Sequence, residues 1–103
     1  MFGIMLKEYR KKEKLYEQLR ELTDKSRKEP SNLNLRVRIG DLLIKTGRKK
    51  EGILLYRWTA ERFTENFYFS KALALNKVVM RLDPSRTNRD WRSKLYEESR
   101  RAA

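Results

Sequence analysis

The basic side chains are the residues of this sequence best suited to a chemical task, and that task is binding anions. The 103 residues include 26 Lys and Arg against 14 Asp and Glu, a formal net charge of +12 at pH 7. The basic residues cluster between Lys7 and Lys14, directly after Gly47, and near the C-terminus. Clustered guanidinium and ammonium groups bind phosphates or carboxylates. We therefore expect a polyanion or an acidic protein segment as a partner, against the alternative of a merely solubilising surface.

Two interpretations compete for the aromatic side chains in the middle of the chain. Trp58, Phe67, Tyr68 and Phe69 could stack on the bases of single-stranded nucleic acid. Aromatic residues around a turn between helices more often fill the core of a helical hairpin, and we favour this second interpretation. Near the C-terminus, Trp91 is expected either to seal the end of a helical stack or to form part of a partner interface.

Most catalytic and metal-binding chemistry is excluded by composition. The chain contains no His and no Cys, which removes disulfides, thiolate nucleophiles, Cys/His zinc sites and imidazole catalysis. Glu61 and Glu65 lie four residues apart, but Arg57 and Arg62 beside them indicate surface ion pairs rather than a catalytic carboxylate pair. No glycine-rich phosphate loop is present. We expect no enzyme activity, no cofactor and no metal.

The elements that position these residues are predicted to be helices. Only two Pro and four Gly interrupt the chain, and apolar residues recur at helical spacing. The first helix is predicted over about 4–28. The second begins after a cap at Ser31 or Asn32 and ends at a turn at Gly47. The remaining three are predicted over about 49–66, 70–82 and 90–101. The predicted fold class is all-α with about five helices. The expected core residues are Leu15, Leu19 and Leu22; Leu35, Ile39, Leu42 and Leu43; Ile53, Tyr56, Ala60 and Phe63; and Ala72, Leu75, Val79 and Leu82. The apolar stripe of the first helix also includes Met5, Tyr9 and Tyr16, and the charged run from Arg10 to Lys14 interrupts it.

The central stretch, residues 30–84, resembles the tetratricopeptide repeat (TPR) family. Ile39-Gly40 stands at the Leu-Gly position of the pattern, Gly52 at the small-residue position, Tyr56 at the later aromatic position and Pro84 at the closing proline. The pattern departs from the family where Arg36 replaces Trp, and where Gly52 and Ala72 lie only twenty residues apart. The third helix therefore has to serve two hairpins. The resemblance implies antiparallel helical hairpins in a short right-handed solenoid or bundle.

The resemblance divides the chain into three parts and implies binding rather than chemistry. Residues 1–29 are expected to form a basic amphipathic helix, 30–84 the TPR-like core and 85–103 a C-terminal capping helix. TPR-like modules are protein-interaction scaffolds. In some of them Lys and Asn grip a C-terminal carboxylate, but Val37 and Asp41 occupy those places here, so we expect no such clamp.

Two sets of residues are the candidate partner-binding residues. The first lies on the expected inner surface of the second helix: Asn34, Val37, Arg38, Asp41 and Lys45. The second lies on the last helix: Arg86, Arg89, Arg92 and Trp91. Three arginines at the N-terminal end of a helix oppose the helix dipole, which favours a role in binding over a role in helix stability.

The sequence thus predicts a non-enzymatic adaptor that binds an acidic segment of another protein. The alternatives are a helical module that binds nucleic acid through phosphate contacts, or a structural subunit of a larger assembly. The terminal helices could also pair two copies. Membrane association is the least favoured, because four acidic residues dilute the positive charge of the first helix: Glu8, Glu13, Glu17 and Glu21. No run approaches the ~20 apolar residues of a membrane-spanning helix, and we expect a cytoplasmic protein.

Overall fold

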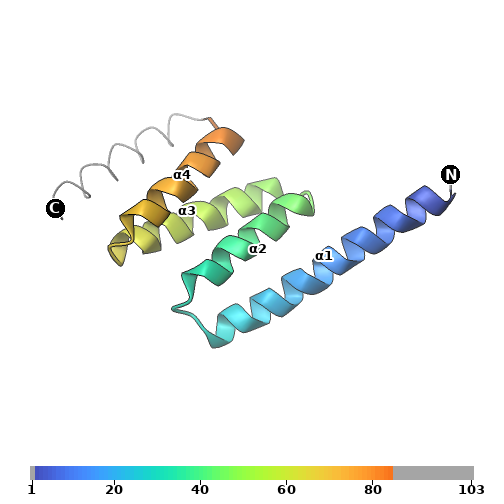
Figure 1. Cartoon of the computed structure of the whole chain (residues 1–103), viewed down its shortest axis with the longest axis horizontal. Helices are drawn as coiled ribbons and strands as arrows, with labels where there is room; N and C mark the ends of the chain where they lie inside the picture. Colours follow the sequence, from blue (N-terminus) through green and yellow to red (C-terminus); the bar gives the residue numbers. More distant parts are fainter. Residues whose placement is uncertain (1, 85–103) are drawn as a thin grey trace. The chain divides into compact units, whose positions relative to one another are not determined.

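The computed structural model describes residues 2–84, which form four α-helices and the short connections between them (Figure 1). These are α1 (Phe2–Lys28), α2 (Leu33–Lys45), α3 (Lys49–Glu65) and α4 (Phe69–Leu82). The described range contains no β-strand, so the predicted all-α class is confirmed there. The fifth predicted helix, at about 90–101, lies outside the described residues. The chain divides between Gly52 and Ile53 into two compact units. The domain limits expected at 29/30 and 84/85 remain predictions.

In the first unit, the C-terminal half of α1 packs on α2. Leu19 and Ser26 are buried on α1, and Leu15 and Leu22 are half-buried. All four core residues predicted on α2 are buried. Asn32 occupies the N-cap position of α2, but its side chain makes no capping hydrogen bond. The short connection is instead held by the Arg36 guanidinium, whose Nη1 donates to the Pro30 carbonyl over 2.8 Å.

The N-terminal half of α1 does not continue this packed face. Met5, Tyr9 and Tyr16 were expected on the apolar stripe of the first helix, yet all three are exposed. Helix α1 has 27 residues and α2 only 13, which correspond to lengths of about 40 Å and about 20 Å. Because α2 is too short to cover all of α1, it leaves the apolar residues of the first half exposed.

Gly52 allows the first turn of α3 to lie close to the backbone of α2. A Cβ atom added to Gly52 would lie 2.6 Å from Ile44 Cδ1 and 3.2 Å from the carbonyl oxygen of Gly40. Any side chain at position 52 would therefore displace its neighbours. Gly52 is needed here for close approach and not for an unusual backbone angle.

In the second unit, α3 and α4 form an antiparallel hairpin with a core of small and large apolar residues. Ala60 and Ala72 are fully buried, which allows the two helices to approach closely. The predicted core residues Ile53, Tyr56, Phe63, Leu75 and Val79 are also buried, while Leu82 is only half-buried. The Arg57 guanidinium joins the two helices through Asp83, with Nη2 and Oδ2 separated by 3.0 Å.

The α2–α3 and α3–α4 turns have the same hydrogen-bond pattern, twenty residues apart (47 to 67). In the first, the amides of Gly47 and Arg48 donate to the carbonyls of Ile44 and Leu43. In the second, the amides of Phe67 and Tyr68 donate to the carbonyls of Thr64 and Phe63. Both are Schellman motifs, which require a left-handed residue directly after the helix. Gly47, where the sequence predicted a turn, meets this requirement with φ +88°, whereas the second turn uses Phe67 with φ +66°.

Candidate interaction site

A groove of about 420 Å³ lies between α1 and α2. Three residues of α1 and four of α2 line it: Gln18, Glu21 and Leu22; and Arg38, Asp41, Leu42 and Lys45. Apart from the adjacent pairs Glu21/Leu22 and Asp41/Leu42, neighbouring lining residues within each helix are three or four positions apart, which places them on one side of the helix. The groove therefore arises because two such faces meet where α1 packs on α2.

The groove combines charged walls with an apolar floor. Arg38 and Lys45 are exposed cations, and Glu21 and Asp41 are exposed carboxylates, so the formal charges balance. Leu42 is buried and Leu22 is half-buried between them. Such a surface can bind a carboxylate, an amide or hydroxyl group and an apolar side chain at the same time.

The structure brings together three of the five residues predicted on the second helix. Arg38, Asp41 and Lys45 line the groove, whereas Asn34 and Val37 are not among its lining residues. Asn34 is exposed and Val37 half-buried. The candidate residues of the last helix, Arg86, Arg89, Trp91 and Arg92, lie outside the described residues.

Sequence reasoning missed the contribution of α1 to this site. Leu22 was expected to be a core residue only, Glu21 was considered only as a residue that dilutes the positive charge of the first helix, and Gln18 was not singled out. The spacing of Leu15, Leu19 and Leu22 did indicate which side of α1 is buried. Gln18 and Glu21 flank that side, so they border whatever helix packs there, but the sequence pattern does not name that helix.

The basic cluster after Gly47 is partly neutralised. Arg48 is the second residue of the α2–α3 turn, and its Nε donates to Glu51 Oε1 over 3.0 Å. The hydrogen bond with Arg48 lowers the pKa of the Glu51 carboxyl below its ordinary value, and the bond with Glu51 raises the pKa of Arg48. Glu51 also lies in the first turn of α3, where a negative charge is favoured by the helix dipole.

The aromatic residues at the α3–α4 turn do not fill a core, contrary to the interpretation favoured from the sequence. Phe67 is 75% exposed, Tyr68 55% and Trp58 39%, while Phe69 is half-buried. The backbone explains the first two: the left-handed conformation of Phe67 ends α3 and turns the chain away from the packed face. Trp58 lies on the outer face of α3, beneath the guanidinium of Arg62 at 5.3 Å from the ring centroid.

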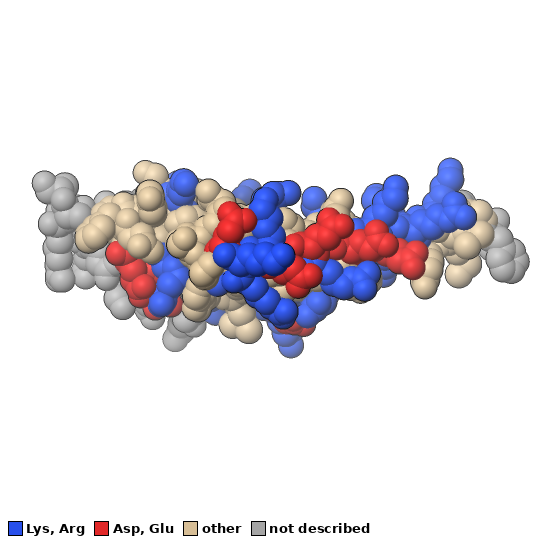
Figure 2. Space-filling model, turned by 90° about the horizontal axis from the view of Figure 1, so that it is seen from below, with Lys and Arg blue, Asp and Glu red and all other residues tan. Residues whose placement is uncertain are grey.

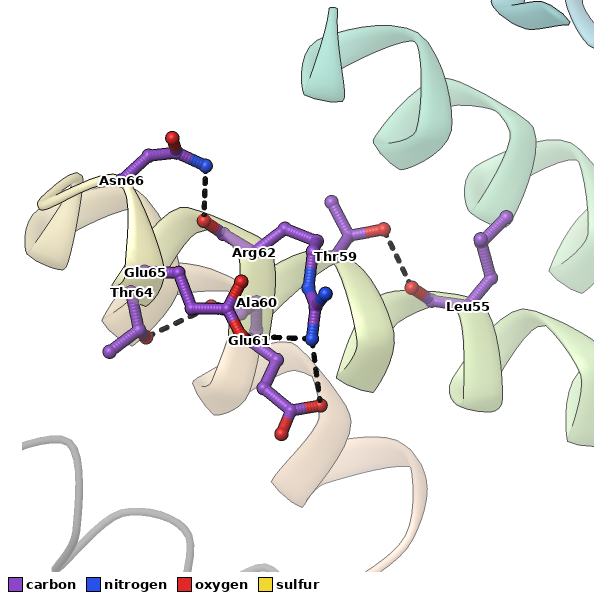
Figure 3. Close-up of polar contacts among 8 residues, drawn as sticks. All are labelled: Leu55, Thr59, Ala60, Glu61, Arg62, Thr64, Glu65 and Asn66. Carbon is purple, nitrogen blue, oxygen red and sulfur yellow. Dashed lines mark hydrogen bonds and ion pairs between the residues drawn. The ribbon is translucent and has the colours of Figure 1, made fainter. Parts of the chain in front are cut away.

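The acidic residues of α3 form surface ion pairs, as predicted, although with one exchange of partner. Arg62 Nη2 lies 2.9 Å from Glu65 Oε1 and 4.0 Å from Glu61 Oε2 (Figure 3). Arg57, expected in the same cluster, pairs instead with Asp83, the residue directly after α4. The side-chain amide of Asn66 donates to the Arg62 carbonyl and so caps the C-terminal end of α3.

The positive charge is not gathered into a continuous patch on the face shown in Figure 2. Over α1, in the right-hand part of that view, acidic side chains lie among the basic ones. A phosphate-binding surface needs cations that are not each matched by a carboxylate. On this face, α1 therefore resembles an ordinary mixed-charge helix surface.

Comparisons of the chain with protein-family models, with curated proteins and with solved structures find no match. Among the helices of residues 2–84, none combines the length and the apolar character that crossing a membrane requires.

Proposed function

We propose that this chain is a non-enzymatic, TPR-like helical adaptor that binds a short acidic segment of another protein. The observation that carries the proposal is the groove between α1 and α2. Its lining includes Arg38, Asp41 and Lys45 of α2, which were predicted from the sequence as partner-binding residues, together with three residues of α1.

The lining of the groove defines the segment that would fit it. Arg38 and Lys45 bind carboxylates of the segment, because charge-assisted hydrogen bonds to carboxylates are among the strongest in proteins. Leu22 and Leu42 receive an apolar side chain, and Asp41 accepts a hydrogen bond from an amide, hydroxyl or ammonium group. A volume of about 420 Å³ holds a few side chains. The fitting ligand is therefore a short segment with acidic residues beside an apolar one.

The charge of the whole chain supports an acidic partner. A net charge of +12 on 103 residues attracts acidic partners over a distance and accelerates their association. The balanced charge of the groove itself then selects among those partners by geometry. Long-range attraction and local selectivity thus come from different residues.

Close packing of small residues supports the TPR-like part of the proposal. Gly40 and Gly52 meet between α2 and α3, and Ala60 and Ala72 are both fully buried in the α3–α4 hairpin. Each pair is separated by twelve residues (40 to 52 and 60 to 72). Helical repeats use a small residue on each helix so that the backbones can approach. The two pairs therefore support the close backbone approach that a TPR-like repeat needs, once in each compact unit.

A peptide selection tests the proposal. The whole chain is immobilised and a library of random short peptides is selected against it at physiological salt. The binding of selected peptides is then measured by fluorescence anisotropy. We expect the selected peptides to carry carboxylates beside an apolar residue. They should bind the double variant R38Q/K45Q at least about 10-fold more weakly than the unaltered chain, because hydrogen bonds to charged groups contribute roughly 1.5–3 kcal/mol each.

The matched control is K49Q/K50Q, which removes the same charge from exposed residues that do not line the groove. Selected peptides should bind this variant as they bind the unaltered chain. The proposal fails if no peptide is enriched. It also fails if the two double variants weaken binding equally, because binding would then depend on net charge alone.

A further inference from the structure

We propose that the α3–α4 turn is a binding site for single-stranded nucleic acid. In this site Phe67 and Tyr68 stack against bases, and Lys71 binds the phosphate backbone. The site lies in the second unit and does not depend on the groove between α1 and α2.

The backbone of Phe67 is the first observation. An L-residue in the left-handed region costs about 1–2 kcal/mol, and glycine avoids most of that cost. The same motif is closed by Gly47 in the α2–α3 turn but by Phe67 in the α3–α4 turn. Since the ring of Phe67 is 75% exposed, burial does not compensate for the strain. The ring makes one edge-on aromatic contact, with Phe69, and strain retained for so small a structural return indicates a function.

The orientation of the rings is the second observation. Phe67 meets Phe69 edge-on with ring centroids 6.1 Å apart, and Tyr68 meets Phe63 edge-on at 6.3 Å. Phe63 is buried in the hairpin core, so it fixes the position of Tyr68. Both exposed rings are therefore supported from within the turn while much of their surface remains open to solvent. Such preorganised rings are the stacking platforms on which single-stranded nucleic acids bind.

Charge decides which occupant fits these rings. The Lys71 ammonium lies over the Tyr68 ring, 5.4 Å from its centroid, so one face of this ring carries a cation and a base would stack on the opposite face. Glu65, the nearest acidic residue in sequence, is already paired with Arg62. A nucleotide offers a flat ring and a negative charge in the same unit and uses both features. An uncharged apolar peptide would leave Lys71 unused.

The inference is tested by the binding of a short labelled oligo(dT) to the whole chain. Binding is measured by fluorescence anisotropy at physiological salt, and a duplex of the same length serves as the comparison. We expect the single strand to bind more tightly than the duplex. F67A should bind the single strand about 5- to 150-fold more weakly, the range expected for the loss of one stacked base. F67W should retain binding because it keeps a ring.

Leu54 provides the matched control, because it is an apolar residue of the same unit that is 63% exposed and lies away from the turn. L54A should bind the oligonucleotide as the unaltered chain does, and circular dichroism should show that all variants keep their helix content. The inference is overturned if the chain does not bind at physiological salt, or if F67A and L54A bind alike. It is also overturned if F67A loses a peptide ligand and not the oligonucleotide, since the turn would then be a protein-docking surface.

Discussion

Substitutions at the left-handed residue of each turn should change the free energy of unfolding by similar amounts in opposite directions. Removing glycine should lower it at Gly47, and introducing glycine should raise it at Phe67 relative to alanine. Both turns have the same pair of backbone hydrogen bonds and a residue with positive φ after the helix, Gly47 in one and Phe67 in the other. A Cβ atom added at Gly47 meets no atom within 4 Å. The effect of G47A is therefore conformational and free of steric overlap.

The expected magnitude follows from two opposing terms. The left-handed conformation costs an L-residue about 1–2 kcal/mol. Replacing glycine by alanine restores about 0.4–1 kcal/mol by restricting the unfolded chain. We therefore expect G47A to lower the free energy of unfolding by roughly 1 kcal/mol. At the other turn, F67G should be more stable than F67A by the same amount, because both lack the ring and only glycine relieves the strain.

Equilibrium unfolding in urea, followed by circular dichroism at the helical band, measures both differences. The comparison of F67G with F67A excludes the contact between Phe67 and Phe69, which both variants lose. The reasoning is refuted if G47A unfolds at the same urea concentration as the unaltered chain. It is equally refuted if F67G is no more stable than F67A, since Phe67 would then not be strained.

Three further changes test other features of the structure. Asn76 is 1% exposed and its Nδ2 has no hydrogen-bond partner in the described part of the chain, so N76L should raise the free energy of unfolding by about 1 kcal/mol; a lower urea midpoint would contradict this. G52V should cost about 1–3 kcal/mol through overpacking, and I44V, which removes the nearest atom, should recover part of that loss in the double variant; additive effects would show that the two side chains do not meet. The pKa of Glu51 is lowered by Arg48, so this pair stabilises the fold above the unfolded-state pKa of Glu51, and its contribution is lost as pH falls through the lower folded-state pKa. Carboxyl chemical shifts from NMR should show the Glu51 pKa rising in R48Q, and an unchanged pKa would exclude the hydrogen bond in solution.

The local structure of residues 2–84 was largely determined by the sequence itself. Three-to-four-residue spacing of apolar residues located α2, α3 and α4 to within a residue or two. It also identified core residues such as Leu35, Tyr56 and Val79, all of which are buried. Pro30 and Gly47 marked the ends of helices for reasons that act within a few residues: proline excludes the helical conformation before it, and glycine accepts positive φ. Arg38, Asp41 and Lys45 could be assigned to one face of α2 by the same periodicity.

Which faces are covered, and by what, was decided only by the tertiary structure. The periodicity that located Leu19 also put Tyr9 on the apolar stripe of the first helix, but α2 is too short to reach Tyr9, which is exposed. Phe67 and Tyr68 were expected inside the hairpin because aromatic residues favour burial, yet the Schellman turn directs them to solvent. The groove needed Glu21 and Leu22 of α1 beside Asp41 of α2. Contacts between helices depend on the lengths and relative positions of elements far apart in the chain. The local spacing of apolar residues does not specify these lengths and positions.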